Sequence, residues 1–143
     1  MGYTVEATED VAQFLRELSV EEFTEVTSRI RMLEEFGPSL DRPYAGTLRD
    51  KKVSKLKELR IRHERKQFRI IFAFDSARNA ILLVGGDKVP LGGKLWYPKF
   101  IKRAKQLLNE HELRLEEQKR LEAEGKGAVP KARRISGVKR DRR

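Results

Sequence analysis

The side chains best able to do chemistry in this sequence are cationic. They follow one another along the middle of the chain: Arg60, Arg62, Arg69, Lys88 and Lys94, with Tyr97 close behind. The sequence has no cysteine, and its two histidines, His63 and His111, are far apart in the chain. It also has no H-x-x-x-H or C-x-x-C motif and no cluster of aspartates. We therefore expect chemistry that needs neither a metal nor another cofactor.

Such a set of cations suits the cleavage of RNA by attack of a 2′-hydroxyl on the neighbouring phosphate. Negative charge then develops on the non-bridging oxygens and on the leaving 5′-oxygen, where arginine forks can bind it bidentately. A lysine, a tyrosine or a histidine can transfer protons, and a base could stack on Trp96 or Tyr97. Two simpler roles also fit, because outward arginines on a strand are commonly solvated and Trp96 could anchor a helix.

Three consecutive strands must position these side chains. Within residues 58–63, Leu59 and Ile61 alternate with arginines. Residues 68–74 place four apolar side chains on one face and Arg69, Ile71 and Ala73 on the other, and residues 80–84 form a continuous apolar run. The short connections favour antiparallel pairing, because a parallel crossover needs about a dozen residues or more. The pattern predicts a small, mainly antiparallel curved sheet with one apolar face and one face that carries arginines.

Helices should cover this sheet. A short strand at residues 3–7 comes first, Thr8 can cap a first helix, and Ser19 with Glu22 forms a capping box that starts a second one. The apolar stripes of these two N-terminal helices should pack on the apolar face of the sheet. A last helix, with Pro98 in its first turn, should also dock on the sheet. The sequence therefore predicts an α+β fold.

The positive charge is concentrated in one part of the chain. The formal net charge is +10, but residues 1–43 hold 4 Lys and Arg against 10 Asp and Glu, whereas residues 44–105 hold 17 against 5. Such an asymmetry points to a polyanionic partner, most often nucleic acid. We assign RNA binding to basic and aromatic residues in or beside the arginine strands: Arg49, Lys52, Lys57, Arg62, Lys94 and Trp96.

The chain divides into three parts. We expect one domain over residues 1–112, a charged helical extension over residues 113–124, and a basic tail over residues 125–143 that is disordered in isolation. No segment is long and apolar enough for a membrane span, and no signal peptide precedes the first strand. Together with the lack of cysteine, these features predict a cytoplasmic protein.

Several of these segments also resemble a known family. The segments are K-E-L-R-I (57–61), F-R-I-I-F-A-F-D (68–75) and I-L-L-V-G-G-D-K (81–88), supported by L-E-E-F-G-P-S-L-D-R-P (33–43) and W-Y-P-K-F-I-K-R-A (96–104). In their order and spacing they resemble the phage-derived HigB-like branch of the RelE/ParE toxin superfamily, the toxin half of type II toxin–antitoxin systems. The resemblance covers about residues 3–112 and leaves out the tail.

The resemblance implies a RelE-like fold and a ribosome-dependent mRNA endoribonuclease that needs no metal and inhibits translation. It also implies a helix-turn-helix antitoxin that neutralises the toxin in a shared oligomer. By similarity, Arg60 and Arg69 bind the phosphate and stabilise the transition state, and Lys88 adds a further cation. Tyr97 would stack or transfer a proton, and His63 is a further proton-transfer candidate.

Two departures from the family pattern leave the general acid and base open. The chain lacks the C-terminal histidine-rich pattern of some HigB toxins, and it has G-D-K at residues 86–88 where many relatives have F-x-K-K. Two other functions stay open as well. One is a ParE-like inhibitor of DNA gyrase, and the other is a non-catalytic protein that binds RNA or DNA. The arginine face counts against the gyrase inhibitor, because it would have no polyanion to bind.

Overall fold

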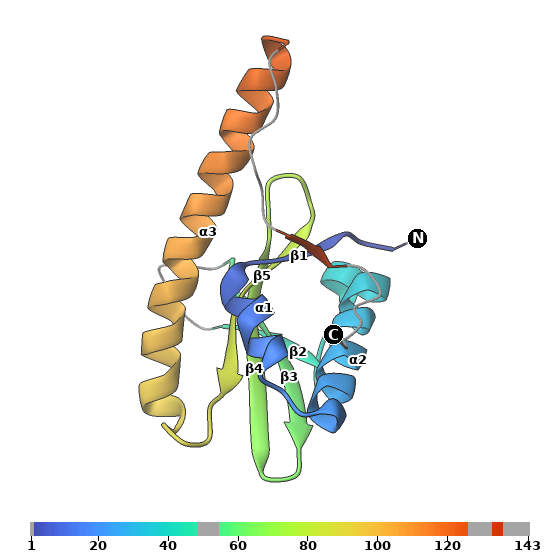
Figure 1. Cartoon of the computed structure of the whole chain (residues 1–143), viewed down its shortest axis with the longest axis vertical. Coiled ribbons are helices and arrows are strands. Elements are labelled where there is room, and N and C mark those ends of the chain that lie inside the picture. Colours follow the sequence, from blue (N-terminus) through green and yellow to red (C-terminus); the bar gives the residue numbers. More distant parts are fainter. Residues whose placement is uncertain (1, 49–54, 126–132, 136–143) are drawn as a thin grey trace.

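A mixed β-sheet lies at the centre of the computed structural model, which describes residues 2–48, 55–125 and 133–135 (Figure 1). Its strands are β1 (Val5–Ala7), β2 (Ala45–Thr47), β3 (Lys57–His63), β4 (Lys66–Phe74), β5 (Ala80–Asp87) and β6 (Arg133–Ile135). Among the described residues they form one sheet in the order β2-β3-β4-β5-β1-β6. The three strands expected to carry the arginines are therefore neighbours, joined as two antiparallel pairs.

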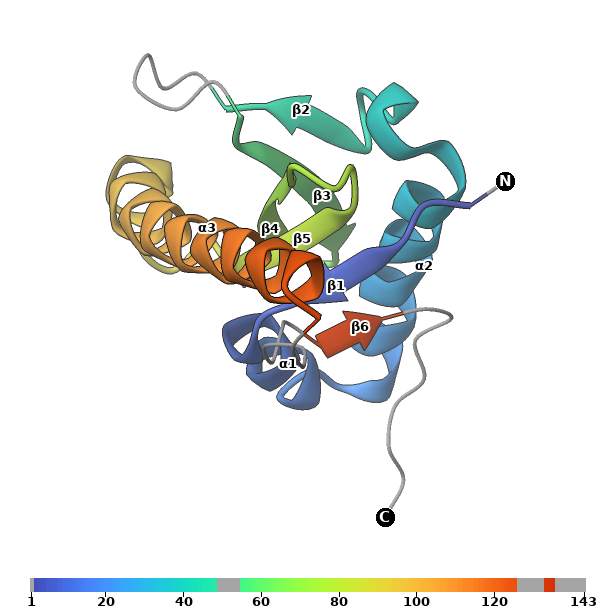
Figure 2. The same ribbon diagram turned by 90° about the horizontal axis from the view of Figure 1, so that it is seen from above.

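The sheet is mixed, which corrects the expectation of a mainly antiparallel one. β1 runs parallel to β5, with Val5 opposite Ala80, whereas the other described neighbours are antiparallel. The chain between these two strands contains both N-terminal helices, so its length allows a parallel pairing. β6, which belongs to the expected tail, pairs with the other edge of β1 (Figures 1 and 2). The composition of the tail gave no indication of this strand.

The N-terminal helices begin where their capping residues predict. Thr8 Oγ1 accepts a hydrogen bond from Val11 N at the start of α1 (Glu9–Arg16). Ser19 and Glu22 form both bonds of the capping box at the start of α2 (Val20–Phe36), which is followed by the short 3₁₀ helix η1 (Gly37–Ser39). Local hydrogen bonding between neighbouring residues decides these boundaries, so the sequence alone could locate them.

The C-terminal helix, α3 (Gly93–Ala123), begins earlier than expected. Pro98 lies inside this helix and not in its first turn, because Leu95 N and Trp96 N already donate to the carbonyl of Gly92. The helix continues without a break through the expected extension, and its end projects beyond the sheet (Figure 1).

Two apolar layers hold the helices on opposite faces of the sheet (Figure 2). Phe68, Ile70 and Phe72 pack with α1 and α2, whereas Ile71 and Ala73, on the other face of β4, pack with α3. Burial of each such large side chain contributes about 1.5–3 kcal/mol.

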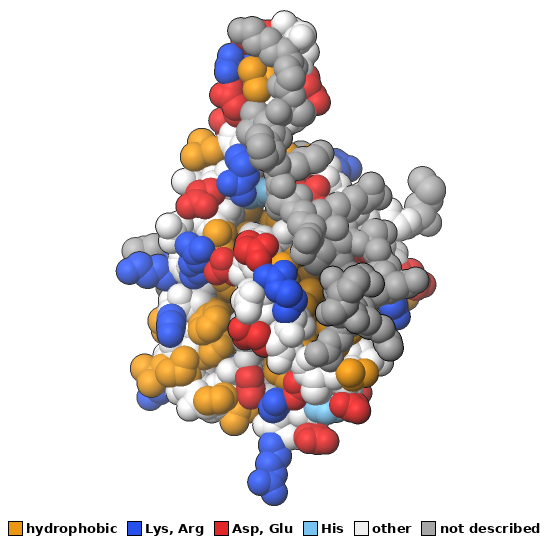
Figure 3. Space-filling view, viewed as in Figure 1, with side chains coloured by type: hydrophobic (Ala, Val, Ile, Leu, Met, Phe, Trp, Pro, Cys, Tyr) orange, Lys and Arg blue, Asp and Glu red, His pale blue; other side chains and the backbone are white. Residues whose placement is uncertain are grey.

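The face of the molecule seen in Figure 3 mixes acidic and basic side chains, so the net charge does not make that face uniformly basic. None of the described helices combines enough length with enough apolar character to cross a membrane.

Candidate active site

The two arginines expected to bind phosphate lie directly opposite each other. Arg60 on β3 is the register partner of Arg69 on β4. Side chains alternate between the faces of a strand, so both point to the face that α3 packs on, together with Glu58. Like charges this close repel each other, so a partner of opposite charge must hold the pair.

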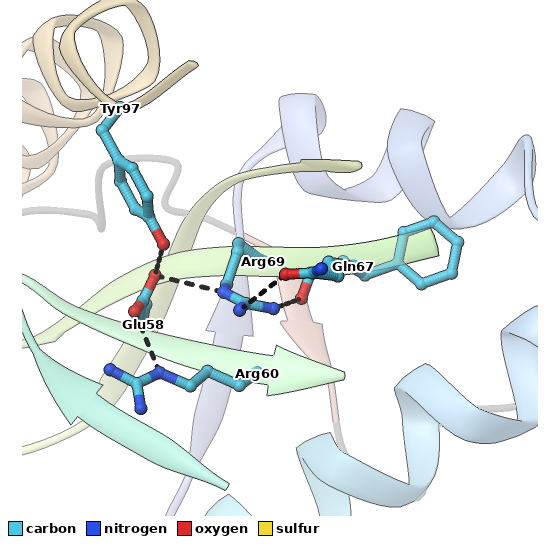
Figure 4. Close-up of polar contacts among 6 residues, drawn as sticks. Glu58, Arg60, Gln67, Arg69 and Tyr97 are labelled. Carbon is cyan, nitrogen blue, oxygen red and sulfur yellow. Dashed lines mark hydrogen bonds and ion pairs between the residues drawn. The ribbon is translucent and has the colours of Figure 1, made fainter. Parts of the chain in front are cut away.

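Glu58 supplies this opposite charge at the centre of the cluster (Figure 4). It is 4% exposed; Arg60 Nε lies 3.0 Å from its Oε2, and Arg69 Nε lies 3.6 Å from its Oε1. The hydroxyl of Tyr97 on α3 donates a hydrogen bond of 2.6 Å to the same Oε1. A buried carboxylate is costly unless it is paired and hydrogen-bonded, so these contacts fix all four side chains relative to one another.

Arg69 is the more enclosed of the two arginines. Its Nη atoms donate to the carbonyl of Phe68 at 3.0 Å and to Oε1 of Gln67 at 3.4 Å, and its side chain is 12% exposed, against 32% for Arg60. Arg60 therefore has the guanidinium that an incoming anion can reach more easily. Arg69 has the guanidinium whose position the surrounding protein fixes.

Lys88 and Tyr97 have shifted pKa values for identifiable reasons. Burial and the hydrogen bond to Glu58 raise the pKa of Tyr97 to about 12, so this phenol keeps its proton at neutral pH. Burial, and then the nearby charge of Arg69, lower the pKa of Lys88, whose Nζ lies 5.5 Å from the centre of the Tyr97 ring. Lys88 can therefore lose its proton more readily than an ordinary lysine, and Tyr97 less readily than an ordinary tyrosine.

Comparison with known proteins gives the family of the chain. The family model described as Phage derived protein Gp49-like (DUF891) matches residues 13–109. The chain belongs to this family. The match includes β3, β4, β5 and the start of α3, and therefore every side chain of the Glu58 cluster. It confirms the resemblance to the phage-derived HigB-like branch.

Two relatives from Mycobacterium tuberculosis (strain ATCC 25618 / H37Rv) are similar to this Gp49-like chain. One is named "Putative toxin HigB2" and is 37% identical over 120 residues, which is 83% of this chain and 59% of the relative. The other is named "Putative toxin HigB3" and is 46% identical over 81 residues, which is 57% of this chain and 68% of the relative. The chain thus spans less than two thirds of the length of the HigB2 relative.

Gly46 on β2 gives Arg60 the space to reach Glu58. It lies opposite Glu58 in the β2–β3 pair, and a Cβ atom built on it would be 2.6 Å from an Nη atom of Arg60. Because the end of a flexible side chain can move away, Gly46→Ala should displace Arg60 and leave the fold intact. For the RNA cleavage proposed below, we expect the rate to fall by about 10–100-fold with little change in Tm.

The matched control for this exchange is Gly2→Ala, because its Cβ would lie 3.4 Å from the Glu34 carbonyl, an ordinary contact. Single-turnover cleavage rates of both variants measure the change in activity, and their thermal unfolding shows whether the fold is intact. Unchanged cleavage by Gly46→Ala would show that Arg60 does not need its observed position.

The predicted RNA-binding residues, and His63 as the further proton-transfer candidate, do not all join the Glu58 cluster. Arg62 lies on the same face and is exposed, and Lys94 is exposed in the first turn of α3. Lys57 and His63 alternate onto the opposite face, where Lys57 Nζ lies 5.8 Å from the centre of the Phe74 ring. His63 Nε2 is 3.9 Å from Glu64, away from the arginine pair. Arg49 and Lys52 lie outside the described residues.

Trp96 belongs to the core and not to an RNA-binding surface. Its side chain is 1% exposed, and its ring stacks on Phe100 with 4.3 Å between the ring centres. A base cannot stack on a ring that is already covered by the protein. The burial therefore corrects the assignment of Trp96 to RNA binding and supports its alternative role as the anchor of α3.

Sequence reasoning did not identify Glu58 as a site residue. Its position two residues before Arg60 was the available signal, because residues at i and i+2 share a face of a strand. Its importance arises from Arg69 and Tyr97, which come from other elements.

A second polar cluster lies between the sheet and α3, and the sequence did not indicate it. Glu6, Asp75 and His111 are buried and place one possible metal-ligand atom each within 4.8 Å of the others. His111 Nε2 is 2.8 Å from Asp75 Oδ2, and Asp75 Oδ1 accepts hydrogen bonds from the backbone of Ala77 and Asn79. Both oxygens of Asp75 are thus engaged within the protein. We interpret the contact as a buried hydrogen-bonded pair that docks α3 on the end of β4.

Proposed function

We propose that this Gp49-like protein is the toxin of a type II toxin–antitoxin system and cleaves mRNA on the ribosome. The observation that carries the proposal is the pair of arginines held by one buried carboxylate, with Lys88 and Tyr97 beside them. The names of the two relatives support the toxin part of the proposal. We further propose that the arrangement of helices and sheet is RelE-like, and that the protein acts in the cytoplasm.

The chemistry of this proposal is an internal transesterification of RNA. The 2′-oxygen forms a bond to the adjacent phosphorus, and the bond from phosphorus to the 5′-oxygen breaks. A base takes the proton of the 2′-hydroxyl, and an acid gives one to the leaving oxygen. Arg60 and Arg69 bind the phosphate oxygens, whose charge increases in the transition state. Their fixed geometry means that little reorganisation is needed during the reaction.

Lys88 is the proposed proton-transfer residue, because burial lowers its pKa. Tyr97, with its proton bound to Glu58, is a poor base and instead fixes the carboxylate. Lys88→Arg keeps a positive charge that does not titrate in the neutral range. We expect this variant to lower the cleavage rate by about 10²–10⁴-fold.

The pH–rate profile is the measurement that separates proton transfer from charge alone. For the unmodified chain, the rate should rise with pH until it passes the lowered pKa of Lys88, and this rise should be absent in Lys88→Arg. If Lys88→Arg retains the full cleavage rate and the same pH–rate profile, Lys88 contributes its positive charge and does not transfer a proton.

A controlled expression experiment tests the proposed function itself. The chain would be induced from a tight promoter while protein synthesis, DNA supercoiling and mRNA 5′ ends are followed together. Rapid loss of translation with new ends inside coding frames is the expected result. Intact mRNA with relaxed or broken DNA would instead support the gyrase inhibitor, and strongly salt-dependent RNA binding without cleavage would support a non-catalytic binder. Co-expression of the adjacent open reading frame should restore growth if it encodes the helix-turn-helix antitoxin.

A further inference from the structure

A cleft of about 360 Å³ continues from the arginine pair around the open end of β3. Four arginines line this cleft, one from α2 and three from β3 and β4. Together with a tyrosine and a glutamine, the polar lining consists of Arg29, Tyr44, Arg60, Arg62, Gln67 and Arg69. Beyond the short strand β2, the outer edge of β3 has no strand beside it among the described residues, whereas β4 pairs with its other edge. The cleft therefore joins the proposed catalytic face to a second group of side chains.

Arg29 and Tyr44 form this second group. The guanidinium carbon of Arg29 lies 4.6 Å from the centre of the Tyr44 ring, and Tyr44 is 38% exposed. The backbone carbonyl of Tyr44 accepts a hydrogen bond of 2.8 Å from Arg60 N. The position of Tyr44 is thus tied directly to one of the two proposed phosphate-binding residues.

Two guanidinium nitrogens of this cleft make no hydrogen bond within the described residues, although Arg69 Nε forms an ion pair of 3.6 Å with Glu58. The buried side-chain nitrogens without a hydrogen-bond partner among the described residues are Arg29 Nε, Arg69 Nε and His111 Nδ1. The first two belong to residues that line this one cleft. Burial lowers the pKa of Arg29 and outweighs the opposite effect of Tyr44 and Glu25. Buried donors are rarely left unpaired, so a ligand with acceptor oxygens fits here.

We propose that Arg29 and Tyr44 form a subsite for a nucleotide of single-stranded RNA next to the phosphate that is cleaved. Arg29 binds the phosphate of this nucleotide, and the exposed part of the Tyr44 ring contacts its base. Cations alternating with an aromatic ring along a groove are typical of single-stranded nucleic acid binding, in which charge follows the backbone and rings stack on bases. This inference rests on the proposed function, because it assumes that the arginine pair binds RNA.

The test is RNA binding by the full chain, measured by fluorescence anisotropy with a 2′-O-methyl RNA hexanucleotide. The methyl group blocks the nucleophile, so binding is measured without cleavage. Arg29→Gln should weaken binding by about tenfold or more. Loss of one phosphate contact should also reduce the slope of log K against log salt concentration by about 0.7. Tyr44→Ala should weaken binding by about fivefold or more without changing the slope.

Arg16→Gln is the matched control, because it removes one arginine charge from α1, where Arg16 pairs with the exposed Glu9. It should leave RNA binding almost unchanged. Because Arg29 Nε has no partner among the described residues, Arg29→Gln should keep Tm within about 4 °C of the unmodified chain. Weaker binding therefore cannot be attributed to unfolding.

The outcomes separate this subsite from the proposed function. If Arg69→Ala weakens binding while Arg29→Gln and Tyr44→Ala do not, the subsite is wrong and the proposed RNA site stands. If Arg29→Gln leaves RNA binding unchanged and instead weakens binding of an acidic protein, this surface is a protein interface; the subsite is then wrong, and the proposed cleavage of mRNA on the ribosome is tested separately by the expression experiment. Equal weakening by Arg16→Gln would also overturn the subsite, because only total charge would then matter.

Discussion

Arg69→Ala should abolish the growth arrest that we propose the chain causes and lower the rate of the proposed RNA cleavage by about 10²–10³-fold. Arg69 approaches Glu58 and donates hydrogen bonds to Phe68 and Gln67, so its guanidinium is fixed before RNA arrives. A donor with a fixed position binds the charge of the transition state without reorganisation, and alanine removes that donor entirely. Arg60→Ala should have a similar effect, because Arg60 is the register partner and is more accessible.

The fold should survive Arg69→Ala, since Glu58 keeps its contacts with Arg60 and Tyr97. Circular dichroism and thermal unfolding would establish this before activity is compared. Arg69→Lys tests whether charge is sufficient, because lysine lacks the fork that binds two phosphate oxygens. We expect this variant to recover only a small part of the activity. A folded Arg69→Ala variant that still stops translation would show that the arginine pair is not the catalytic centre.

The strands β3 and β4 and the starts of α1 and α2 could be predicted because they depend on nearby residues. Alternation of apolar and charged residues gave the faces of β3 and β4, and it correctly placed Arg60 and Arg69 together. The capping residues Thr8 and Ser19 gave the starts of α1 and α2. In each case the deciding interactions span only a few residues, so the sequence carries the information directly.

Contacts between elements that are far apart in the sequence could not be predicted from local patterns. The pairing of β1 with β5 and with β6 depends on which edge of the sheet stays open after the other strands have assembled. Glu58 gains its importance from Tyr97 on α3, and Arg29 gains its importance from Tyr44. Trp96 was placed at the surface as one alternative because its spacing fits both a surface and a core position. Tertiary packing decides each of these cases.

Disruption of the Asp75–His111 pair should cause the largest loss of stability among the exchanges considered. Both side chains are fully buried, and their contact of 2.8 Å joins α3 to the end of β4. Removal of the imidazole leaves Oδ2 of Asp75 buried without a partner, while Oδ1 keeps its two backbone hydrogen bonds. His111→Ala should therefore lower the free energy of unfolding by about 3–5 kcal/mol. Urea unfolding at neutral pH measures this loss.

The Asp75–His111 pair should also make the free energy of unfolding depend on pH in the acidic range. Burial by itself raises the pKa of Asp75, but the hydrogen bonds from His111, Asn79 and Ala77 outweigh it and leave this pKa below its usual value of 3.8. A group with a lowered pKa in the folded state contributes stability above its usual pKa and loses it as the pH falls through the folded value. Unfolding below pH 3.8 should therefore be steeper for the unmodified chain than for Asp75→Asn.

Ser76→Ala is the control for this exchange, because Ser76 Oγ donates to Glu112 Oε1 at 3.0 Å across the same two elements but at the exposed surface. Its loss should cost less than about 1 kcal/mol, since water can replace an exposed hydrogen bond. A double exchange of Asp75 and His111 should cost less than the sum of the single ones, because each single exchange leaves an unpaired partner. Additive losses would show that the two side chains act separately, and the docking of α3 would then rest on its apolar contacts alone.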